Sequence, residues 1–186
     1  MAKARKFVAY RRLERPYTRI SKFKKKSYVR SRPHSNIVRY DMGNATKKFE
    51  FQLDLCSKDV LQIRHNAIES ARQTTNKMLE SKIGGTDYFF KIRIYPHHIL
   101  RENPLASGAG ADRMSTGMQA SFGKAIGSAA RITKKGQVLF SVYTNKSQLD
   151  IAKKALKRAS YKIPCSTLIK IKNLEENKNA KKYIKN

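Results

Sequence analysis

The sequence predicts an α+β fold: two strand–helix–strand units forming a sandwich of antiparallel sheet and two helices, with a basic N-terminal extension. Three observations support this prediction. Strict alternation of apolar residues indicates half-buried strands, apolar residues three or four positions apart indicate amphipathic helices, and the order strand, helix, strand occurs twice. With 186 residues, of which 40% are apolar, the chain has the length of one domain with extensions and can bury a core.

Charge and composition divide the chain into three regions. Residues 1–48 are a basic arm, residues 49–172 are an α+β core domain with a long loop at 102–128, and residues 173–186 are a tail rich in Asn and Lys. The whole chain carries 41 Lys and Arg against 13 Asp and Glu, a net charge of +28. Such a charge repels itself in a compact fold unless a polyanion neutralises it. We therefore expect a phosphate-rich partner and disfavour a free-standing metabolic enzyme.

The arm carries half of the net charge, with 16 basic residues against Glu14 and Asp41. Aromatic residues interleave with its basic residues: Phe7, Tyr10, Tyr17, Phe23 and Tyr28. Aromatic rings stack on unpaired bases, which favours RNA as the partner. Two alternatives are a solvated, disordered basic tail and a localisation signal around Lys24–Lys26. Because the arm has few apolar residues, we expect it to become ordered only on its partner.

The first strand–helix–strand unit begins with the alternating segment Phe49–Leu55, a predicted half-buried strand. Ser57 is placed to cap a helix, and Gly84-Gly85 ends it. This helix is predicted to carry Glu69 and Glu80 opposite an apolar stripe of Val60, Ile63, Ala67, Ala71 and Met78. Residues 88–95 form the second predicted strand, which Pro96 stops.

The second unit repeats this order. Residues 138–143 are a predicted strand, Asn145 or Ser147 caps a helix, and residues 167–172 form the final strand after Pro164. The helix is predicted to bury Leu149, Ala152, Leu156 and Ala159 and to expose Lys153, Lys154, Lys157 and Arg158. From residue 88 to residue 172 there are sixteen basic residues and three acidic ones. One side of the domain is therefore expected to be an extended electropositive binding surface.

Residues 102–128 are rich in Gly and other small residues and show no periodic apolar face. Long loops of this kind in compact domains are usually functional or disordered. Arg113 stands where a dinucleotide fingerprint needs its third glycine. A Walker loop fails as well, because five residues separate Gly117 from Gly123 and Ala125 cannot ligate magnesium. We expect no cofactor, and an enzyme that acts on nucleic acid, with this loop as a phosphate cradle, is the second function considered.

No metal site is predicted. The adjacent His97 and His98 point to opposite faces of a strand, and the other two histidines have no carboxylate or thiol at ligand spacing.

Cys56 and Cys165 are expected to be buried, reduced thiols of an intracellular protein, with a disulfide between them as the alternative. No apolar stretch approaches the ~20 residues of a membrane span, and the basic N-terminus lacks the apolar run of a secretory signal.

Several motifs resemble those of one ribosomal protein family. In chain order they are Arg15-Pro16-Tyr17-Thr18, Asp41-Met42-Gly43-Asn44, Gln62–Ala67, Tyr95–Asn103, Ser107–Met114, Gly117-Met118, Phe122-Gly123-Lys124 and Ala129–Ile132. This set is similar to that of the large-subunit ribosomal protein sixteen family, called L-sixteen in bacteria and L-ten-e in archaea and eukaryotes. The resemblance covers roughly residues 5–172, and the Tyr-Pro-His-His form resembles the archaeal branch more than the eukaryotic one.

The resemblance implies a structural constituent of the cytoplasmic large ribosomal subunit that supports translation and has no enzymatic activity. The implied partners are large-subunit rRNA near the peptidyl-transferase region, tRNA near the peptidyl and aminoacyl sites, and neighbouring ribosomal proteins, with no membrane. The family fold is compatible with the predicted α+β sandwich. The residues predicted to bind rRNA are Arg5, Lys6, Arg11, Arg12, Arg15, Tyr17, Arg19, Lys22, Lys24, Lys25, Lys26, Arg30, Arg32, Arg64, His65, Arg93, His97, His98, Arg101, Lys124 and Arg131. The residues predicted to form a tRNA-proximal loop are Ser107, Gly108, Ala109, Gly110, Ala111, Asp112, Arg113 and Met114.

Three residues depart from the family pattern around this loop. Gln119 replaces a usual arginine, Ala125 replaces a usual proline, and Pro104 stands where a lysine is common. These departures remove two positive charges and one rigid bend.

A third function considered, a chromatin-type DNA binder, would also be basic, but it gives no purpose to the stacking aromatics and the long loop.

Overall fold

The computed structural model describes residues 4–18, 23, 25, 29, 32–103, 108 and 122–174. The described strands form a sheet of five and a sheet of three, accompanied by the helices α1 (His65–Ile83) and α3 (Leu149–Ser160). In chain order the strands are β1 (Asp41–Gly43), β2 (Phe51–Ser57), β3 (Leu61–Arg64), β4 (Phe89–Ile92), β5 (His98–Glu102), β6 (Lys124–Ile132), β7 (Val138–Thr144) and β8 (Thr167–Asn173). Two short 3-10 helices are η1 (Phe7–Ala9) and η3 (Lys146–Gln148).

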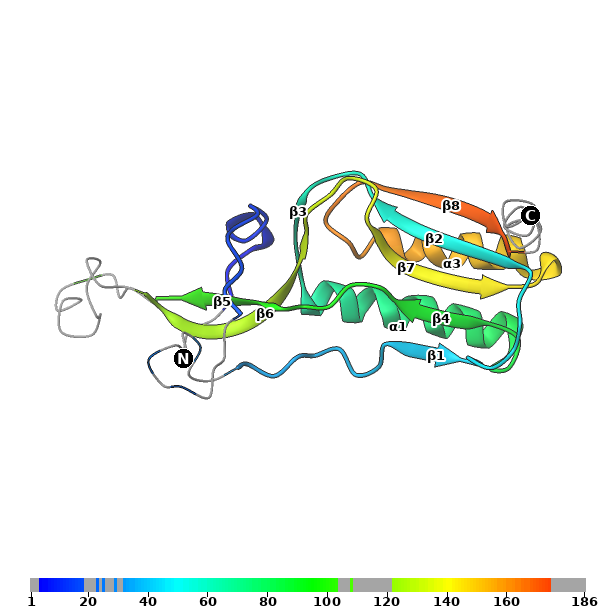
Figure 1. The fold of residues 1–186 in the computed structure, drawn as a ribbon, viewed down its shortest axis with the longest axis horizontal. Coiled ribbons are helices and arrows are strands. Elements are labelled where there is room, and N and C mark those ends of the chain that lie inside the picture. Colours follow the sequence, from blue (N-terminus) through cyan, green and yellow to red (C-terminus); the bar gives the residue numbers. More distant parts are fainter. Residues whose placement is uncertain are drawn as a thin grey trace, which may run out of the picture.

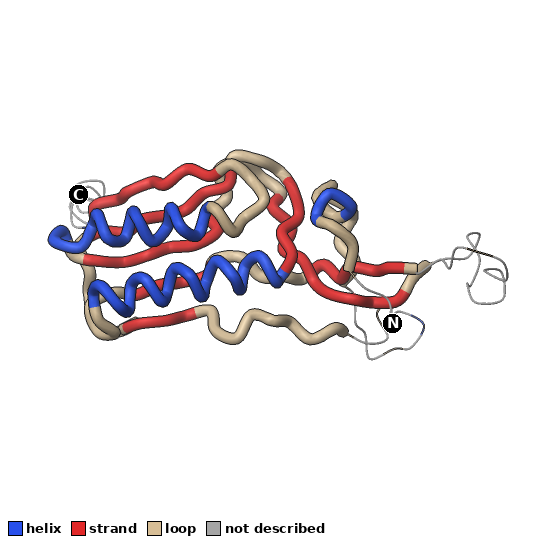
Figure 2. Tube along the Cα trace, turned by 180° about the vertical axis from the view of Figure 1, so that it is seen from behind, coloured by secondary structure: helices blue, strands red, loops and turns tan. Residues whose placement is uncertain are grey.

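The five-stranded sheet has the order β1-β4-β7-β2-β8 and carries both helices on one face (Figure 1, Figure 2). Each neighbouring pair of strands is antiparallel. Alternate strand residues point toward the helices, and those with no exposed surface include Leu53, Leu55, Phe90, Phe140 and Val142. They belong to one core cluster with the inner faces of α1 and α3. The predicted α+β sandwich with two helices is therefore confirmed.

The three-stranded sheet, in the order β3-β6-β5, extends to one side of the sandwich (Figure 1). β5 and β6 form an antiparallel hairpin, and residues 103–123 join them. Small residues fill the inner side of β6, and Ala129 packs with Tyr10 and Leu100 in a second, smaller core cluster. The loop predicted at 102–128 is thus too long at both ends, because Glu102 lies in β5 and residues 124–128 lie in β6.

The start of the first helix differs from the prediction. α1 begins at His65, because residues 61–64 pair with β6 as strand β3 instead of forming helical turns. Ser57 caps no helix: its Oγ accepts a hydrogen bond from Asp59 N at 3.2 Å in a local turn. Glu69 was expected on the exposed side but is only 8% exposed. Gly84 ends α1 with φ +91°, as predicted.

The second helix follows the predicted pattern except at its cap. Ala152, Leu156 and Ala159 are fully buried, and Leu149 packs against the same core. Lys154, Lys157 and Arg158 are exposed, and Lys153 is partly exposed. The predicted cap is wrong, because the short helix η3 precedes α3. The N-cap residue is Asn145 in η3 and Gln148 in α3, and neither makes a side-chain capping hydrogen bond.

The arm is partly folded onto the domain. Residues 41–43 form the edge strand β1, which pairs with β4, and Ile37 and Met42 belong to the main core. Tyr10 belongs to the smaller cluster under the hairpin. The expectation that the arm becomes ordered only on a partner is therefore wrong for these residues, because a few apolar side chains suffice when the domain supplies the rest of each cluster.

Candidate nucleic-acid interface

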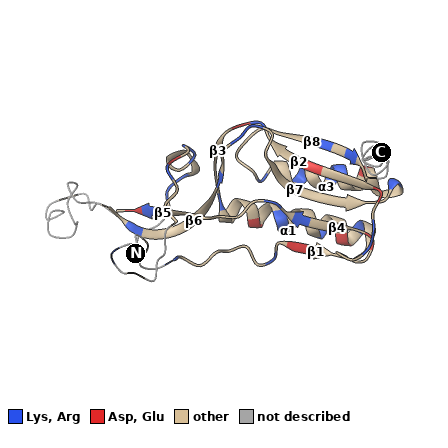
Figure 3. Cartoon of the chain, in the orientation of Figure 1, with Lys and Arg blue, Asp and Glu red and all other residues tan. Residues whose placement is uncertain are grey.

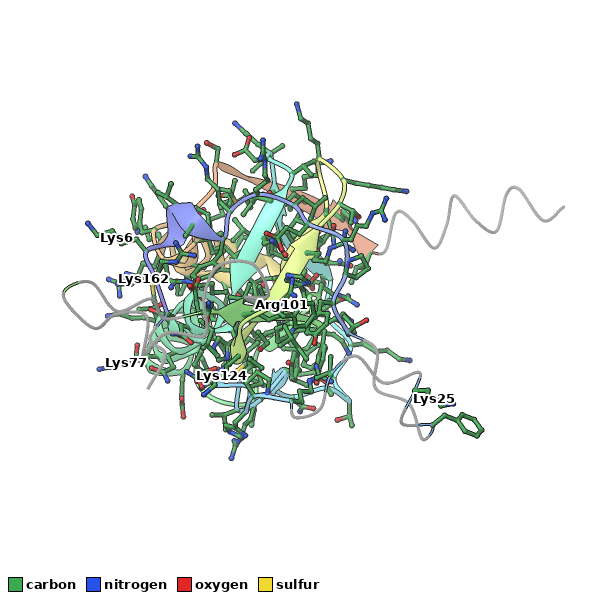
Figure 4. All side chains as sticks on the ribbon, turned by 90° about the vertical axis from the view of Figure 1, so that its left-hand side faces the viewer. Lys6, Lys25, Lys77, Arg101, Lys124 and Lys162 are labelled. Carbon is green, nitrogen blue, oxygen red and sulfur yellow. The ribbon has the colours of Figure 1, made fainter. Side chains whose placement is uncertain are left out.

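Most of the described residues of the predicted basic set lie at the end of the molecule that carries the arm and the hairpin, whereas Arg93 contacts β7 of the five-stranded sheet. Figure 3 shows Lys and Arg along the arm and at the outer end of the hairpin. Figure 4 looks onto this end, with Arg101 and Lys124 near its centre and Lys6 and Lys25 at its margin. The exposed residues of the predicted set are Arg5, Lys6, Arg11, Arg12, Arg15, Lys25, Arg32, Arg93, His97 and Lys124.

Several predicted site residues lie outside the described part of the chain. They are Arg19, Lys22, Lys24, Lys26 and Arg30 of the arm, and Ser107, Ala109, Gly110, Ala111, Asp112, Arg113 and Met114 of the loop. Gly108 is described, and its φ of +128° is a backbone conformation that residues other than glycine rarely adopt. The departures at Pro104 and Gln119 also lie outside the described residues, whereas Ala125 is an exposed residue of β6.

The arm is held to the domain through its main chain. The Gln62 side chain donates to the carbonyls of Tyr10 at 3.2 Å and Arg12 at 2.5 Å, and Gln62 N donates to Arg11 O at 3.1 Å. Arg131 Nε donates to Glu14 O at 2.9 Å. The side chains of Arg11 and Arg12 therefore point to solvent while their backbone is fixed. Gln62 was noted only as part of the Gln62–Ala67 motif, although a glutamine between the apolar residues of β3 is a signal for a buried polar contact.

Two histidines predicted to bind rRNA are buried. His98 is 2% exposed, and its Nδ1 accepts a hydrogen bond from Tyr17 N at 3.0 Å. His65 is 9% exposed, and its Nδ1 accepts from Asn36 N at 3.1 Å. Burial is the main cause that lowers the pKa of each imidazole, so both are neutral acceptors at pH 7. The structure thus places them as anchors of the arm and not on the surface, because their acceptor nitrogens hold its main chain.

A buried carboxylate lies at the outer end of the β5–β6 hairpin, where Glu102 of β5 pairs with Lys124 of β6. Glu102 is 7% exposed and accepts hydrogen bonds from Tyr10 Oη at 2.6 Å and Arg5 Nε at 2.9 Å. Burial, followed by the hydrogen bond to Glu102, raises the pKa of Tyr10. Arg5 is therefore already paired with an acid, and its charge is less available to a phosphate than that of Lys6 or Arg11.

Arg101 lies against two aromatic rings where the hairpin strands end. Its guanidinium carbon is 4.5 Å from the ring centroid of Tyr17 and 4.1 Å from that of Phe122. The two rings meet edge to face at a centroid distance of 5.4 Å. This cation–π cluster joins the arm, β5 and the end of the connecting segment. Phe122 is 61% exposed, so the cluster also presents an aromatic surface to solvent.

The face of the five-stranded sheet opposite the helices contains a charged network that the sequence did not reveal. Asp54 is completely buried and accepts from Ser141 Oγ at 2.6 Å, Gln52 Nε2 at 2.7 Å and Lys172 Nζ at 2.8 Å. Burial alone would raise the pKa of Asp54, but these hydrogen bonds outweigh it and hold the pKa below its ordinary value. Arg93 donates from Nε to Ser141 Oγ at 3.0 Å and extends the network to the end of β4.

The described residues show no metal centre and no disulfide. They contain no group of three or more His, Cys, Asp or Glu side chains placed to hold a metal ion. Cys56 and Cys165 are free thiols, and burial raises the pKa of both. Among the helices that the structure describes, none combines the length and apolar character needed to cross a membrane.

Comparison with known proteins gives the family context. The family model described as ribosomal protein L16p/L10e matches residues 16–170. The large ribosomal subunit protein uL16 of Methanococcus maripaludis is 49% identical over 161 residues, which cover 86% of this chain and 89% of that protein. The uL16 protein of Archaeoglobus fulgidus is 45% identical over 167 residues, covering 90% and 92%. The uL16 protein of Metallosphaera sedula is 43% identical over 157 residues, covering 84% and 90%.

Proposed function

The chain belongs to the ribosomal protein L16p/L10e family, and from this premise we propose that it binds large-subunit rRNA near the peptidyl-transferase region and presents its loop toward tRNA. Its relatives are large-subunit proteins, so the coarse role is structural and not enzymatic. As a constituent of the large ribosomal subunit it works in the cytoplasm. The loop of this proposal comprises residues 107–114.

One observation carries the rRNA assignment: the basic side chains of the arm are exposed while its backbone is fixed. Lys6, Arg11 and Arg12 are exposed, and no Asp or Glu carboxylate of the described residues lies within 4.0 Å of their charged groups. Fixing the main chain before binding removes part of the ordering cost that a flexible tail would incur. Arginine forks match phosphate oxygens in geometry and charge, so this surface suits a phosphate backbone.

The tRNA assignment rests on the position of the loop. Residues 107–114 lie in the segment that joins β5 to β6, and these two strands form a hairpin that extends away from the sandwich, where β3, β6 and the arm attach it (Figure 1). A segment on such an extension can reach a second RNA while the arm contacts the first. Neighbouring ribosomal proteins are further partners of this proposal, since the sandwich itself presents a large part of the surface.

Sedimentation tests the proposal. A tagged full chain is expressed in an archaeal host and its lysate is centrifuged at low salt with intact large subunits. We expect the chain mainly with the large subunit. An Arg11→Glu/Arg12→Glu variant should move toward the free fractions, because two phosphate contacts become repulsive.

The matched control is Lys154→Glu/Lys157→Glu on α3, which changes the net charge by the same amount on the opposite part of the molecule. It should sediment like the unchanged chain. Finding the unchanged chain mainly in the free fractions would refute the ribosomal role. Equal behaviour of the two double variants would refute the assignment of rRNA binding to the arm.

A further inference from the structure

An open pocket of about 430 Å³ lies where three parts of the chain meet. Pro16 and Thr18 come from the arm, and Arg93, Tyr95 and His97 come from the segment between β4 and β5. Ala130 and Arg131 belong to β6, and Thr133 and Gln137 belong to the turn that follows it. The volume falls within the range of about 300–1,000 Å³ that is usual for sites of small organic groups.

Aromatic rings form one wall of the pocket. Tyr95 and His97 lie with their ring centroids 4.7 Å apart, and Tyr40 stacks on Tyr95 at 5.4 Å with an interplanar angle of 23°. The guanidinium carbon of Arg32 lies 5.5 Å from the Tyr95 ring centroid, and Arg32 Nη2 donates to Pro96 O at 3.3 Å. Tyr95 nevertheless remains 42% exposed. The wall is thus a supported stack of planar groups that keeps an open side.

Two guanidinium groups, those of Arg93 and Arg131, also line the pocket. Arg93 is oriented by its bond to Ser141 Oγ and by a second one to Tyr143 Oη, and Arg131 is oriented by its bond to Glu14 O. No Asp or Glu side chain lines the pocket, and none of the described carboxylates lies within 4.0 Å of either guanidinium. Positioned cations without a protein counter-ion, next to an aromatic wall, suit a ligand with a planar ring and an attached anion.

We propose that this pocket receives one unpaired nucleotide of large-subunit rRNA, with its base against Tyr95 and His97 and its phosphate at Arg93 and Arg131. The inference rests on the proposed rRNA binding and adds a single, defined insertion site to it. A base that is still paired and stacked in a helix cannot offer its face to a side chain, so the nucleotide must be unpaired.

The open side of the pocket favours a nucleotide of a chain over a free one. Sites for free small ligands bury most of the ligand surface, whereas the exposed fraction of Tyr95 leaves room for the backbone to enter and leave. Arg15 precedes Pro16 in the chain and Arg32 follows Thr18, and both are exposed residues of the arm. They offer further phosphate contacts in the flanking sequence.

A cross-linking experiment locates the nucleotide. The full chain is bound to large-subunit rRNA that contains 4-thiouridine, irradiated with long-wavelength ultraviolet light, digested and analysed by mass spectrometry. We expect a cross-link on Tyr95 or His97. Binding of the rRNA with cross-links only in other parts of the chain would overturn the inference and leave the proposed function standing. Failure of the chain to bind rRNA at all would refute the proposed function itself.

Affinity measurements provide the second test. His97→Ala removes an exposed ring whose one described ring contact is Tyr95, so we expect an unchanged thermal transition and a loss of rRNA affinity on the order of ten-fold. Tyr161→Ala is the matched control, since Tyr161 is 73% exposed next to α3, and it should bind like the unchanged chain. Equal affinities of both variants would overturn the inference. Displacement of rRNA by uridine monophosphate at similar concentration would also overturn it, by showing a site for a free nucleotide.

Discussion

At the scale of single residues, the structure distinguishes two glycines whose surroundings the sequence does not show. Gly43 has φ +81° and Gly136 has φ +80°, so both adopt a left-handed conformation that disfavours a side chain. A Cβ on Gly43 would lie 2.2 Å from Tyr88 O, whereas a Cβ on Gly136 would meet nothing within 4 Å. The close approach at Gly43 comes from pairing β1 with β4, and only the folded sheet reveals it.

These glycines give a prediction with an internal control. Gly136→Ala should lower the free energy of unfolding by about 1 kcal/mol, the cost of the left-handed conformation alone. Gly43→Ala should lower it by at least ~2–4 kcal/mol, since the β1–β4 contact must also shift. Chemical denaturation of the two variants and the unchanged chain measures the difference. Equal losses would contradict the close approach.

The buried histidines predict how stability depends on pH. The folded-state pKa values of His65 and His98 lie below the ordinary value of 6.5. The unfolded chain therefore binds more protons than the folded chain below that value, and stability falls as the pH falls from about 6.5. At more acidic pH the lowered pKa of Asp54 acts in the same direction, as its network loses its charge.

Thermal unfolding between pH 7.5 and pH 5 measures this dependence. The melting temperature of the unchanged chain should fall across this interval. His98→Gln replaces the imidazole by an amide, which does not titrate. The melting temperature of this variant should be lower than that of the unchanged chain at pH 7.5, but it should fall less steeply as the pH is lowered. An equally steep fall in this variant would show that His98 does not contribute to the pH dependence.

At the scale of elements, periodic apolar patterns predicted the parts of the fold that are buried against the helices. The strands β2, β7 and β8, the end of α1 and the inner face of α3 agree with the prediction because their apolar residues recur at the spacing of a strand or a helix. β6 was missed because Ala and Gly pack under Tyr10 and Leu100 without any apolar alternation. β3 was missed because Val60, Ile63 and Ala67 imitate a helical spacing, although pairing with β6 decides their conformation.

The candidate site was predictable only in part, for a similar reason. Excess charge located the basic arm and the cationic second half of the domain. Charge alone did not show that Arg5 is paired with Glu102, or that His65 and His98 are buried, since these contacts join residues more than twenty-five positions apart. The stack on Tyr95 was likewise hidden, because Tyr40 and Arg32 reach it from the arm.

Docking of the arm depends on one side chain that can be tested. Gln62→Ala removes the donors to Tyr10 O and Arg12 O. We expect faster amide hydrogen exchange and earlier proteolysis within residues 5–17, and a loss of about 1–3 kcal/mol in unfolding free energy, because buried carbonyls lose their partner. Gln73→Ala on the exposed side of α1 is the control and should leave the arm protected. Unchanged protection in Gln62→Ala would show that the arm is held by other contacts.

The loop should be separable from the fold. Deletion of residues 103–116 is expected to leave the thermal transition of the chain intact, because the described residues of both core clusters lie outside this segment. Subunit joining or tRNA accommodation should be impaired, and Arg113→Ala should give a weaker form of the same defect. A lost thermal transition in the deletion would show that the segment is structural instead. Normal tRNA accommodation by the deleted chain would contradict the proposed role of the loop.

At the scale of the whole molecule, the net charge of +28 predicts a steep dependence of binding on salt. Non-specific phosphate contacts weaken strongly with salt, whereas stacking and shape recognition weaken less. At ~200 mM salt we expect large-subunit rRNA to be retained and duplex DNA of the same length to be released. Filter binding at a series of salt concentrations measures both. Comparable retention of the two would favour a general polyanion binder and count against specific rRNA recognition.

The way the arm is attached has a consequence for how this protein can diverge. The domain holds the arm through main-chain groups: the carbonyls of residues 10, 11, 12 and 14, and the amides of Tyr17 and Asn36. Main-chain groups are common to nearly all residue types, so these hydrogen bonds depend on the side chains of the domain and not on those of the arm. Arm side chains that do not pack on the domain, unlike those of Tyr10, Ile37 and Met42, can therefore be exchanged in the course of evolution, following changes in the partner RNA, without the arm losing its place.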